Sequence, residues 1–399
     1  DFLPLFLLST FPLTIIFGNL LINFYIFLFS INFLVNYKNQ KIIFKDIAFY
    51  ILSFFFISLI VNVFFSLNPE NSLPRVLKII LIFFFIFEIK RLIQKYKENS
   101  MQYVYKSWVL IFLIITIDVF FETFFGFNMI GNTSYMPGRI SSFMGDELII
   151  GAVYHGFILF FLSYLVHKKK NNYLILSIIL VLVASFLIGE RSNFIKLFLA
   201  VIIFGSLALH LSYKIKIIGL LSIIIIFSII LNLSNFYKNR YFYQLRTLMT
   251  IDGYSNYMKQ SQYGAHRNAA IKMLNENFIF GVGIKNFRFE SAKKKYENKE
   301  YLQTKRRQAT HPHQVHHEFL SETGIFGYLC FLIFILLSIF ISYKNYLKFR
   351  ELYQLSSIVF IITSLLPILP SGSFLGTFAS GIFWLNYAVM IGYNRIKKN

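Results

Sequence analysis

The stretch "HPHQVHHEFLSETGIFGYLCFLIFILLSIFIS", residues 311–342, leads from a group of histidines into a long apolar run. Between 318 and 342 the only charged side chains are Glu318 and Glu322, and both lie near the start. About 20 mainly apolar residues in a helix are enough to cross a hydrocarbon core about 30 Å thick. This run is therefore predicted to span a membrane, with the histidines at its entrance.

The rest of the chain has the same character. Of its 399 residues 56% are hydrophobic and 14% are charged, far from the balance of a soluble domain. The apolar runs predict about twelve helical spans, at 2–17, 19–36, 46–67, 75–88, 108–128, 148–166, 173–189, 193–211, 215–233, 318–342, 353–369 and 374–393. The expected fold class is an all-α integral membrane protein.

The two ends of this pattern need separate treatment. The first apolar run passes through Gly18 directly into the second, so we expect it to be a span and not a cleaved signal peptide. The chain begins at Asp1 without a methionine, so a few upstream residues are expected to be missing. Cys330 is the only cysteine, which excludes an intrachain disulfide and a cysteine-based zinc site.

The net charge of +21 is distributed in a way that indicates topology and not nucleic acid binding. Basic clusters follow every second span: Lys38, Lys41 and Lys45; Lys90, Arg91, Lys95, Lys97 and Lys106; Lys168, Lys169 and Lys170; Lys214 and Lys216; Lys344, Lys348 and Arg350; Arg395, Lys397 and Lys398. With twelve spans they share one face, which the positive-inside rule makes the cytoplasmic one. Both termini are then cytoplasmic.

The opposite face receives one long segment, 234–317, between spans nine and ten. It is too long for the charge rule to apply. The predicted organisation is a transmembrane bundle over 1–233, a periplasmic lid-like insert over 234–317, and a second part of the bundle over 318–399. The short loops of this face carry only Arg75, Arg139 and Arg191 as clear basic residues, and these need another explanation.

Two helices are predicted in the insert. Residues 235–249 are basic and rich in aromatic residues, which is typical of a helix on a membrane surface. Residues 266–278 carry an apolar stripe at helical spacing. The segment 291–308 is almost wholly polar and is expected to be solvated.

Three interpretations are open for the histidines at 311, 313, 316 and 317. Two or three imidazoles with Glu318 or Glu322 could bind zinc. The histidines could simply cap span ten. One of them could act as a base or bind a substrate oxygen, since the ordinary histidine pKa lies near working pH. The residue chemistry does not select one of the four.

Three arginines are candidates for binding an anion. Arg191 lies in a tight turn, where it could pair with Glu190, but an ionisable group at membrane depth is by default a functional hypothesis. Arg267 is expected at the start of a helix, whose free amides would assist anion binding, or it could be merely solvated. Arg139 could be neutralised by nearby carboxylates, Asp146 or Glu147. Together they suggest a membrane-embedded substrate that bears phosphate.

Four segments in this order resemble the O-antigen ligase and polymerase superfamily of bacterial envelope glycan assembly. They are "GRISSFMGDELIIGAVY" at 138–154, "GERSN" at 189–193, "FIFGVGIKNF" at 278–287 and "HPHQVHHEFLSETGIFG" at 311–327. The twelve expected spans and the long insert fit the same family. The resemblance covers most of the chain.

The resemblance implies roles for particular residues. Counting back from Glu322, Thr323 and Gly324 aligns His313 with the essential histidine of the family and places Gln314 where asparagine is common. The important extracytoplasmic arginines of the family map onto Arg191 and Arg267. In this reading Arg139, Gln314 and Glu322 have supporting roles, and no metal is bound.

The implied activity is glycosyl transfer on the periplasmic face of the inner membrane, without a cofactor. The donor would be a glycan on undecaprenyl pyrophosphate, held by Arg191 and Arg267, and the acceptor lipid A-core, as for an O-antigen ligase. A polymerase of the same superfamily is the alternative, and a branch that transfers glycan to protein is related. A transporter or flippase is a further alternative, for which Asp118 and Glu122 are the main acids within spans.

Overall fold

The computed structural model describes the residues 2–36, 46–136, 138–145, 149–169, 171–208, 217, 221, 224–225, 227–232, 235–243, 246, 248–250 and 252–395. These residues form helices and connecting loops, with no strand among them. The chain divides into two compact units. Unit 1 comprises Asp1–Tyr25, Leu92–Thr247 and Lys348–Ser364; unit 2 comprises Ile26–Arg91, Leu248–Leu347 and Leu365–Asn399.

The apolar helices are α1 (Phe2–Phe17), α2 (Asn19–Val35), α3 (Ile47–Phe64), α4 (Pro69–Phe125), α5 (Ile150–His167), α6 (Asn171–Leu187), α7 (Arg191–Ala208), α14 (Val315–Phe349), α15 (Leu352–Ser364) and α16 (Thr377–Gly392). Five segments within them are long and apolar enough to cross a membrane: Ile47–Phe64, Met101–Phe125, Ile150–His167, Arg191–Ala208 and Val315–Phe349. The all-helical, membrane character agrees with expectation. The count of twelve spans stays a prediction, and about half of the ninth, 215–233, lies outside the described residues.

The helix α4 differs from expectation. We expected separate spans at 75–88 and 108–128 with a basic cluster between them, and the whole stretch Pro69–Phe125 is helical. After Pro74 the helix contains no proline or glycine to interrupt it, and the residues between the two apolar runs include Lys, Arg, Glu and Gln, which are good helix formers. The two expected spans therefore lie within one helical stretch.

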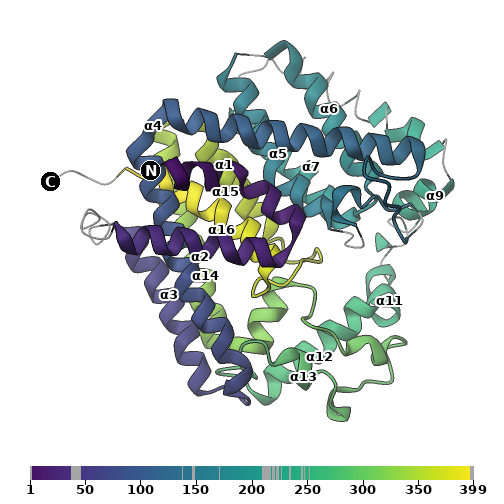
Figure 1. The fold of residues 1–399 in the computed structure, drawn as a ribbon. Helices are drawn as coiled ribbons and strands as arrows, with labels where there is room; N and C mark the ends of the chain where they lie inside the picture. The colour runs from purple at the N-terminus through teal and green to yellow at the C-terminus, as the bar shows by residue number, and fades with distance from the viewer. Residues whose placement is uncertain are drawn as a thin grey trace. The chain divides into compact units, whose positions relative to one another are not determined.

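Unit 1 is built on α5, α7 and α15, which pack against one another, with α6 against α5 and α7 (Figure 1). Tyr105 of α4 stacks on Tyr353 of α15 with ring centroids 3.7 Å apart. Ser163 of α5 shares a hydrogen bond of 2.6 Å with Ser356 of α15. Aromatic stacking and small hydroxyl side chains thus hold α4, α5 and α15 together.

The core of unit 2 joins α3, α14 and α16. The ring of Phe55 stacks on Phe334 at 4.6 Å between centroids, and Phe56 meets Trp384 edge-on at 5.5 Å. The hydroxyls of Tyr387 and Ser338 share a hydrogen bond of 3.0 Å. This packing fixes the helix that carries the histidine motif at its start.

The described residues of the predicted insert, 234–317, include α9 (Asn235–Tyr237), a π-helical stretch at Lys238–Tyr243, α11 (Gly253–Gln260), α12 (Gln262–Glu276), α13 (Phe287–Glu290), and 3-10 turns at Lys294–Tyr296 and Thr304–Arg307. The helix predicted at 266–278 is thus present as α12. It begins four residues earlier because the Ser261 side chain accepts from Gly264 N at 3.2 Å and caps it. The predicted helix at 235–249 is present as short helical turns as far as Tyr243.

The polar segment after α13 is more ordered than expected. The side chains of Tyr296 and Arg307 are 1% and 4% exposed. Tyr296 joins a small core with residues of α12, and its hydroxyl donates to Glu276 Oε2 at 2.8 Å. The expectation of a solvated segment is therefore wrong at these positions, because a single aromatic residue suffices to anchor the segment on α12.

Candidate active site

The helix α14 is broken at Gly324, which has φ 64° and ψ −169°. The break frees carbonyls and amides that the helix would otherwise satisfy. Ser321 O accepts from Val282 N and Glu322 O from Gly283 N, each at 2.9 Å. Beyond the break, two further amides of α14 donate to carbonyls of the same segment, Ile325 N to Phe278 O at 2.9 Å and Phe326 N to Ile279 O at 3.1 Å. The "FIFGVG" segment is thus hydrogen-bonded to α14 on both sides of the break.

The Glu322 side chain holds the continuation of that segment. It is fully buried, and its Oε2 accepts from Lys285 N at 2.8 Å while Oε1 accepts from Phe287 N at 3.3 Å. Lys285 adopts φ 65°, in the left-handed region that a lysine rarely occupies. Glu322 therefore acts as a positioning residue for the loop that carries Lys285.

The side-chain amide of Gln314 caps the start of α14. Its Oε1 accepts from His317 N at 2.9 Å, as a helix cap does, and its Nε2 donates to Pro367 O at 2.8 Å. Next to it, His313 has φ 53°, and its carbonyl accepts from Ser371 N at 2.9 Å. The side-chain amide of Gln314 thus fixes the backbone beside His313. The loop before α16 is hydrogen-bonded to the carbonyl of His313 itself.

The four histidines of the motif have different environments. The His313 ring lies between two others, 4.1 Å from His311 and 5.0 Å from His266 between centroids. Tyr263 meets the same ring edge-on at 6.0 Å. By contrast, the His316 ring forms hydrogen bonds with Leu365 O, at 2.8 Å, and with the hydroxyl of Tyr328. The environments of His313 and His316 therefore differ.

Buried polar atoms without hydrogen-bond partners gather around these histidines. Among the described residues they include His266 Nδ1, Arg267 Nε, His311 Nε2, His317 Nδ1 and Ser371 Oγ. The backbone of Ser371 lies close to the His311 ring, but His311 Nε2 forms no hydrogen bond of normal geometry with it. Buried polar groups in proteins are nearly always paired, so a cluster of unpaired ones indicates a place for a polar ligand.

The electrostatic surroundings keep the central histidines neutral. Burial lowers the pKa of His313 to about 3, and a proton on His311 or His266 would act in the same direction. Burial also lowers the pKa of His311 to about 4, assisted by the charge of Lys285, and lowers that of His266. A neutral imidazole can accept a proton, and an anion bound nearby would raise these pKa values toward working pH.

Arg267 lies in this region but not where the sequence placed it. Because α12 begins at Gln262, Arg267 is in its second turn and away from the free amides, so the helix-start interpretation is wrong. It follows His266 directly, and its charge is close enough to act on His317. Arg267 is thus positioned by α12 at the edge of the histidine cluster.

The zinc interpretation gains no support in the described part of the chain. No group of three His, Cys, Asp or Glu side chains there is arranged to hold a metal ion. The carboxylate of Glu318, one proposed ligand, instead accepts hydrogen bonds from Ser373 Oγ and, at 2.7 Å, from Phe374 N. Glu318 thus fixes the loop before α16.

Unit 1 brings together the other two arginine motifs. The Arg139 guanidinium pairs with Glu190 Oε1 at 3.6 Å, and that oxygen also accepts from Gly151 N at 3.0 Å. Ile140 N donates to Ile188 O at 3.2 Å, so the "GRISS" and "GERSN" segments lie side by side. Glu190 is therefore a partner of Arg139, whereas the expected alternatives, Asp146 and Glu147, lie outside the described residues.

Arg191 is the first residue of α7, directly after this ion pair. Unit 1 thus holds Arg191 and Arg139, and unit 2 holds Arg267 and His313. That the two sets face one substrate stays a prediction.

The acids considered for transport have structural partners. Asp118 Oδ1 accepts from Met129 N at 2.7 Å, and Glu122 Oε2 accepts from Ser142 N at 2.6 Å. The Ser142 hydroxyl also donates to Asp118. Both carboxylates thus hold the loop that follows α4, including the end of the "GRISS" segment.

Comparison with known proteins addresses the resemblance directly. Residues 176–332 match the family model described as O-Antigen ligase. The match confirms the resemblance for this part of the chain, and it includes Arg191, Arg267, His313 and Glu322 but not Arg139. It indicates a membrane enzyme of the O-antigen ligase or polymerase type, which implies lipid-linked glycan substrates. A search of curated proteins gave no significant match.

Sequence reasoning missed several members of the site. His266 and Tyr263 reach His313 from α12, and Lys285 and Ser371 approach from two loops. Only His266 carried a signal, because it directly precedes the candidate Arg267. The other contacts depend on tertiary structure.

Proposed function

We propose that the chain transfers a glycan from undecaprenyl pyrophosphate to an acceptor hydroxyl on the periplasmic face of the inner membrane, as an O-antigen ligase acting on lipid A-core. The observation that best supports this is the position of His313, whose ring lies beside those of His311 and the buried His266 and among unpaired polar atoms. The family match to the same residues supports the reaction class.

In the proposed reaction His313 accepts the proton of the acceptor hydroxyl as its oxygen attacks the anomeric carbon. The bond between that carbon and the pyrophosphate oxygen breaks, and pyrophosphate leaves on its lipid as an anion, with inversion. Because this leaving group is already stable as an anion, no general acid, metal or cofactor is required. General-base assistance typically contributes about 10²- to 10⁴-fold in rate.

The pyrophosphate is proposed to bind Arg267 and Arg191. Arg267 Nε is buried without a partner among the described residues, and the next residue back, His266, contacts the ring of His313. A guanidinium there would bind phosphate oxygens and stabilise the charge of the leaving group, an effect worth about 3 kcal/mol for one well-placed donor. Arg191 is the second arginine proposed to bind the pyrophosphate, on the resemblance to the family alone.

A polymerase of the same superfamily is the second candidate, because the same donor site would serve an acceptor that is another lipid-linked repeat unit. The family match supports both activities equally. Transport is disfavoured by the structural use of Asp118 and Glu122, whose carboxylates accept hydrogen bonds from the loop after α4.

A transfer assay tests the proposal. Purified protein is incubated with a defined glycan on undecaprenyl pyrophosphate and either lipid A-core or a second lipid-linked unit, with and without a chelator. We expect glycan on lipid A-core and no effect of the chelator. Product formed only on the lipid-linked unit would identify a polymerase, and no transfer to either acceptor would contradict the proposal.

A further inference from the structure

Two large apolar side chains are exposed where the "FIFGVG" segment crosses α14. They belong to Phe278 and Ile279, which follow α12 and are 57% and 58% exposed. Neither residue of this exposed pair has a role in the proposed reaction. Neighbouring apolar side chains on a surface often mark a place where a membrane or another protein covers it.

The helix α14 indicates the depth of the exposed pair relative to a membrane. The hydrogen bonds of the crossing place the pair beside Ile325 and Phe326, the first two residues after the break. From there to Lys344 the residues 325–343 carry no charge. At the rise of an α-helix they extend about 28 Å, close to the hydrocarbon thickness of about 30 Å. The start of this stretch, and the pair bonded to it, therefore lie at one edge of the hydrocarbon.

The helix α3 gives the same depth independently. It begins at Ile47, directly after the charged Asp46, and ends at Phe64. Its length is about 27 Å, so its last residues also lie near an edge of the hydrocarbon. The next ring, that of Phe65, stacks on Phe280 with centroids 3.8 Å apart. The end of α3 and the start of the uncharged stretch of α14 thus meet the same segment at the same level.

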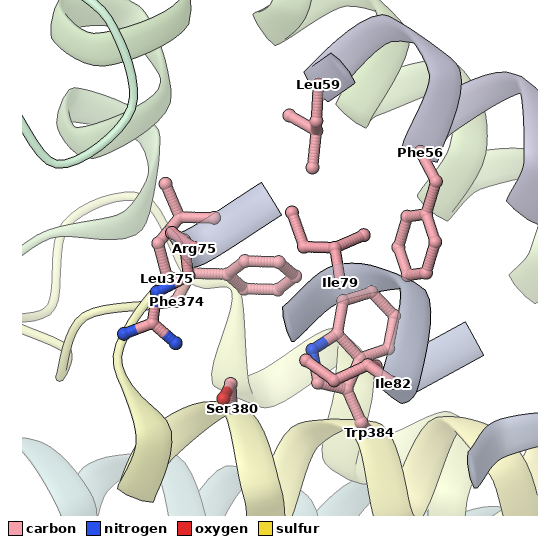
Figure 2. Close-up of a pocket in the computed structure, with 9 residues that line it drawn as sticks. All are labelled: Phe56, Leu59, Arg75, Ile79, Ile82, Phe374, Leu375, Ser380 and Trp384. Atoms are coloured by element: carbon pink, nitrogen blue, oxygen red, sulfur yellow. The ribbon is translucent and has the colours of Figure 1, made fainter. Parts of the chain in front are cut away.

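Exposed apolar side chains lead along both helices to this segment. In α3, Phe56 and Leu59 line a pocket with Trp384, so that side of the helix faces protein (Figure 2). The exposed residues of α3 lie on another face, at helical spacing: Phe54, Ile57 and Phe64. The corresponding residues of α14 are Phe326, Leu329, Ile333 and Leu336. An exposed apolar stripe on a helix that crosses a membrane faces lipid, and the exposed pair adjoins both stripes.

We propose that Phe278 and Ile279 insert into the edge of the membrane hydrocarbon, where lipid acyl chains cover them, and that the segment 278–280 thereby anchors the predicted insert to the membrane surface. Apolar side chains of segments that lie in the membrane interface enter the boundary between headgroups and acyl chains by about 5–10 Å. The depth given by the two helices favours lipid over a protein as the covering partner.

The backbone of the segment suits this position. Hydrocarbon offers no hydrogen bonds, so carbonyl oxygens that face it need partners within the protein. The oxygens of Phe278 and Ile279 accept from the two amides of α14 at the crossing. The oxygen of Phe280 accepts from Asn62 Nδ2 of α3 at 2.6 Å. All three carbonyls of the segment are therefore paired, and they join it to both helices.

The anchor has a consequence for the candidate active site that rests on the proposed function. The same crossing leads, through Glu322, to the loop of Lys285, and α14 begins beside His313. An insert held at the edge of the hydrocarbon keeps His313 near the membrane surface, where the phosphates of a lipid-linked substrate would lie. The insertion of the exposed pair itself does not depend on which reaction is catalysed.

A fluorescent probe on the full-length protein in lipid nanodiscs tests the anchor without requiring turnover. In a Cys330→Ala background, which removes the only cysteine, Phe278→Cys and Ile279→Cys are each labelled with the dye NBD. In hydrocarbon the emission of this dye strengthens and shifts to the blue. We expect this shift at both positions, a loss of fluorescence with lipids that carry a nitroxide on the acyl chain near the headgroup, and protection from iodide in the water.

Two controls define the extremes. Leu302→Cys labels an exposed apolar residue in the polar segment of the predicted insert, and its probe should be quenched by iodide and not by the lipid nitroxide. Leu336→Cys labels an exposed residue about halfway along the uncharged stretch of α14, and its probe should be quenched most by a nitroxide near the end of the acyl chain. Unchanged melting temperatures would show that the labelled proteins fold.

Two results would overturn the proposal. Probes at positions 278 and 279 that iodide quenches as it does at 302 would show that water covers the pair. Probes protected from both iodide and the lipid nitroxides would show that protein covers it, for example a second copy of the chain. Because turnover is not measured, these outcomes are independent of whether glycan transfer occurs.

Discussion

Gly281 and Gly324 meet backbone to backbone where the "FIFGVG" segment crosses the break in α14. A Cβ on Gly281 would lie 2.6 Å from Gly324 N, and one on Gly324 would lie 2.3 Å from Ile279 O. Both residues also have positive φ, of 68° and 64°. The crossing therefore requires glycine at both positions, for space and for backbone conformation.

Gly281→Ala and Gly324→Ala should each destabilise the protein by about 3 kcal/mol or more, because backbone atoms on both sides would have to move. Thermal unfolding in detergent measures the effect. Gly126→Ala is the matched control, since Gly126 has φ 80° but a Cβ there would meet nothing within 4 Å. A loss in the control as large as in the other two would show that backbone conformation, and not the crossing, is responsible.

His313→Asn is the sharpest test of the catalytic assignment. Asparagine tolerates the left-handed backbone of His313 better than alanine does, but it cannot accept a proton. We expect transfer to fall about 10²- to 10⁴-fold while the melting temperature changes little. His167→Asn, which alters an exposed histidine at the end of α5, serves as the control and should retain activity. Normal transfer by a folded His313→Asn protein would refute the role.

His313 shows how far the sequence alone could go. The residue chemistry did not choose among the four histidines, and only the resemblance to the O-antigen ligase superfamily, through the register with Glu322, Thr323 and Gly324, proposed His313. The neighbours of His313 were not predictable in this way, since His266 lies on α12 and Ser371 in the loop before α16. Such contacts are set by packing between distant segments, which a hydropathy pattern does not report.

The helix α4 illustrates the opposite limit. Hydropathy distinguishes apolar from charged stretches, so it separated two spans where charge accumulates between the two apolar runs. Helix formation depends instead on backbone propensity, which Lys, Glu and Gln satisfy, and no residue after Pro74 interrupts it. Likewise, the ion pair between Arg139 and Glu190 joins segments separated by α5 and α6, and only the local neighbours of each residue could be considered from sequence.

Because the pKa values of two histidines are lowered in the folded protein, its stability should fall in acid. In the unfolded chain histidine binds a proton below about pH 6.5, whereas folded His311 and His313 do so only near pH 4 and 3. The unfolded state thus binds more protons in this window, so the free energy of unfolding should fall by about 1.4 kcal/mol per pH unit for each histidine as pH drops below 6.5. Above 6.5 neither group contributes a pH dependence.

Melting temperatures at pH 7.5, 6.0 and 5.0 measure this dependence. The His311→Asn and His313→Asn variants should each show a shallower decline than the unmodified protein, while His167→Asn should decline in parallel with it. Parallel behaviour of all four proteins would mean that the two histidines titrate normally in the folded state.

Bound donor should also change the pH dependence of catalysis. A pyrophosphate near Arg267 would place negative charge close to His313 and raise its pKa from about 3, since an opposite charge favours the protonated form. The acid limb of kcat should therefore lie at higher pH than the acid limb of kcat/KM, which reports the free enzyme. Coincident acid limbs would indicate that the bound donor does not lie near this histidine.

Burial, and not only distance, should decide how strongly Arg139 and Glu190 depend on each other. Their side chains are 15% and 8% exposed, and Glu190 also accepts from Gly151 N, so water screens the attraction between the two charges only weakly. A double-mutant cycle with Arg139→Gln and Glu190→Gln should give a coupling of about 1–3 kcal/mol in thermal unfolding.

The comparison pair is Lys295 and Glu276, whose atoms are closer, at 2.6 Å, but whose side chains are 50% and 42% exposed. Its coupling should stay below about 1 kcal/mol because water screens it. Purely additive effects of the Arg139 and Glu190 substitutions would show that the ion pair does not hold the two segments together.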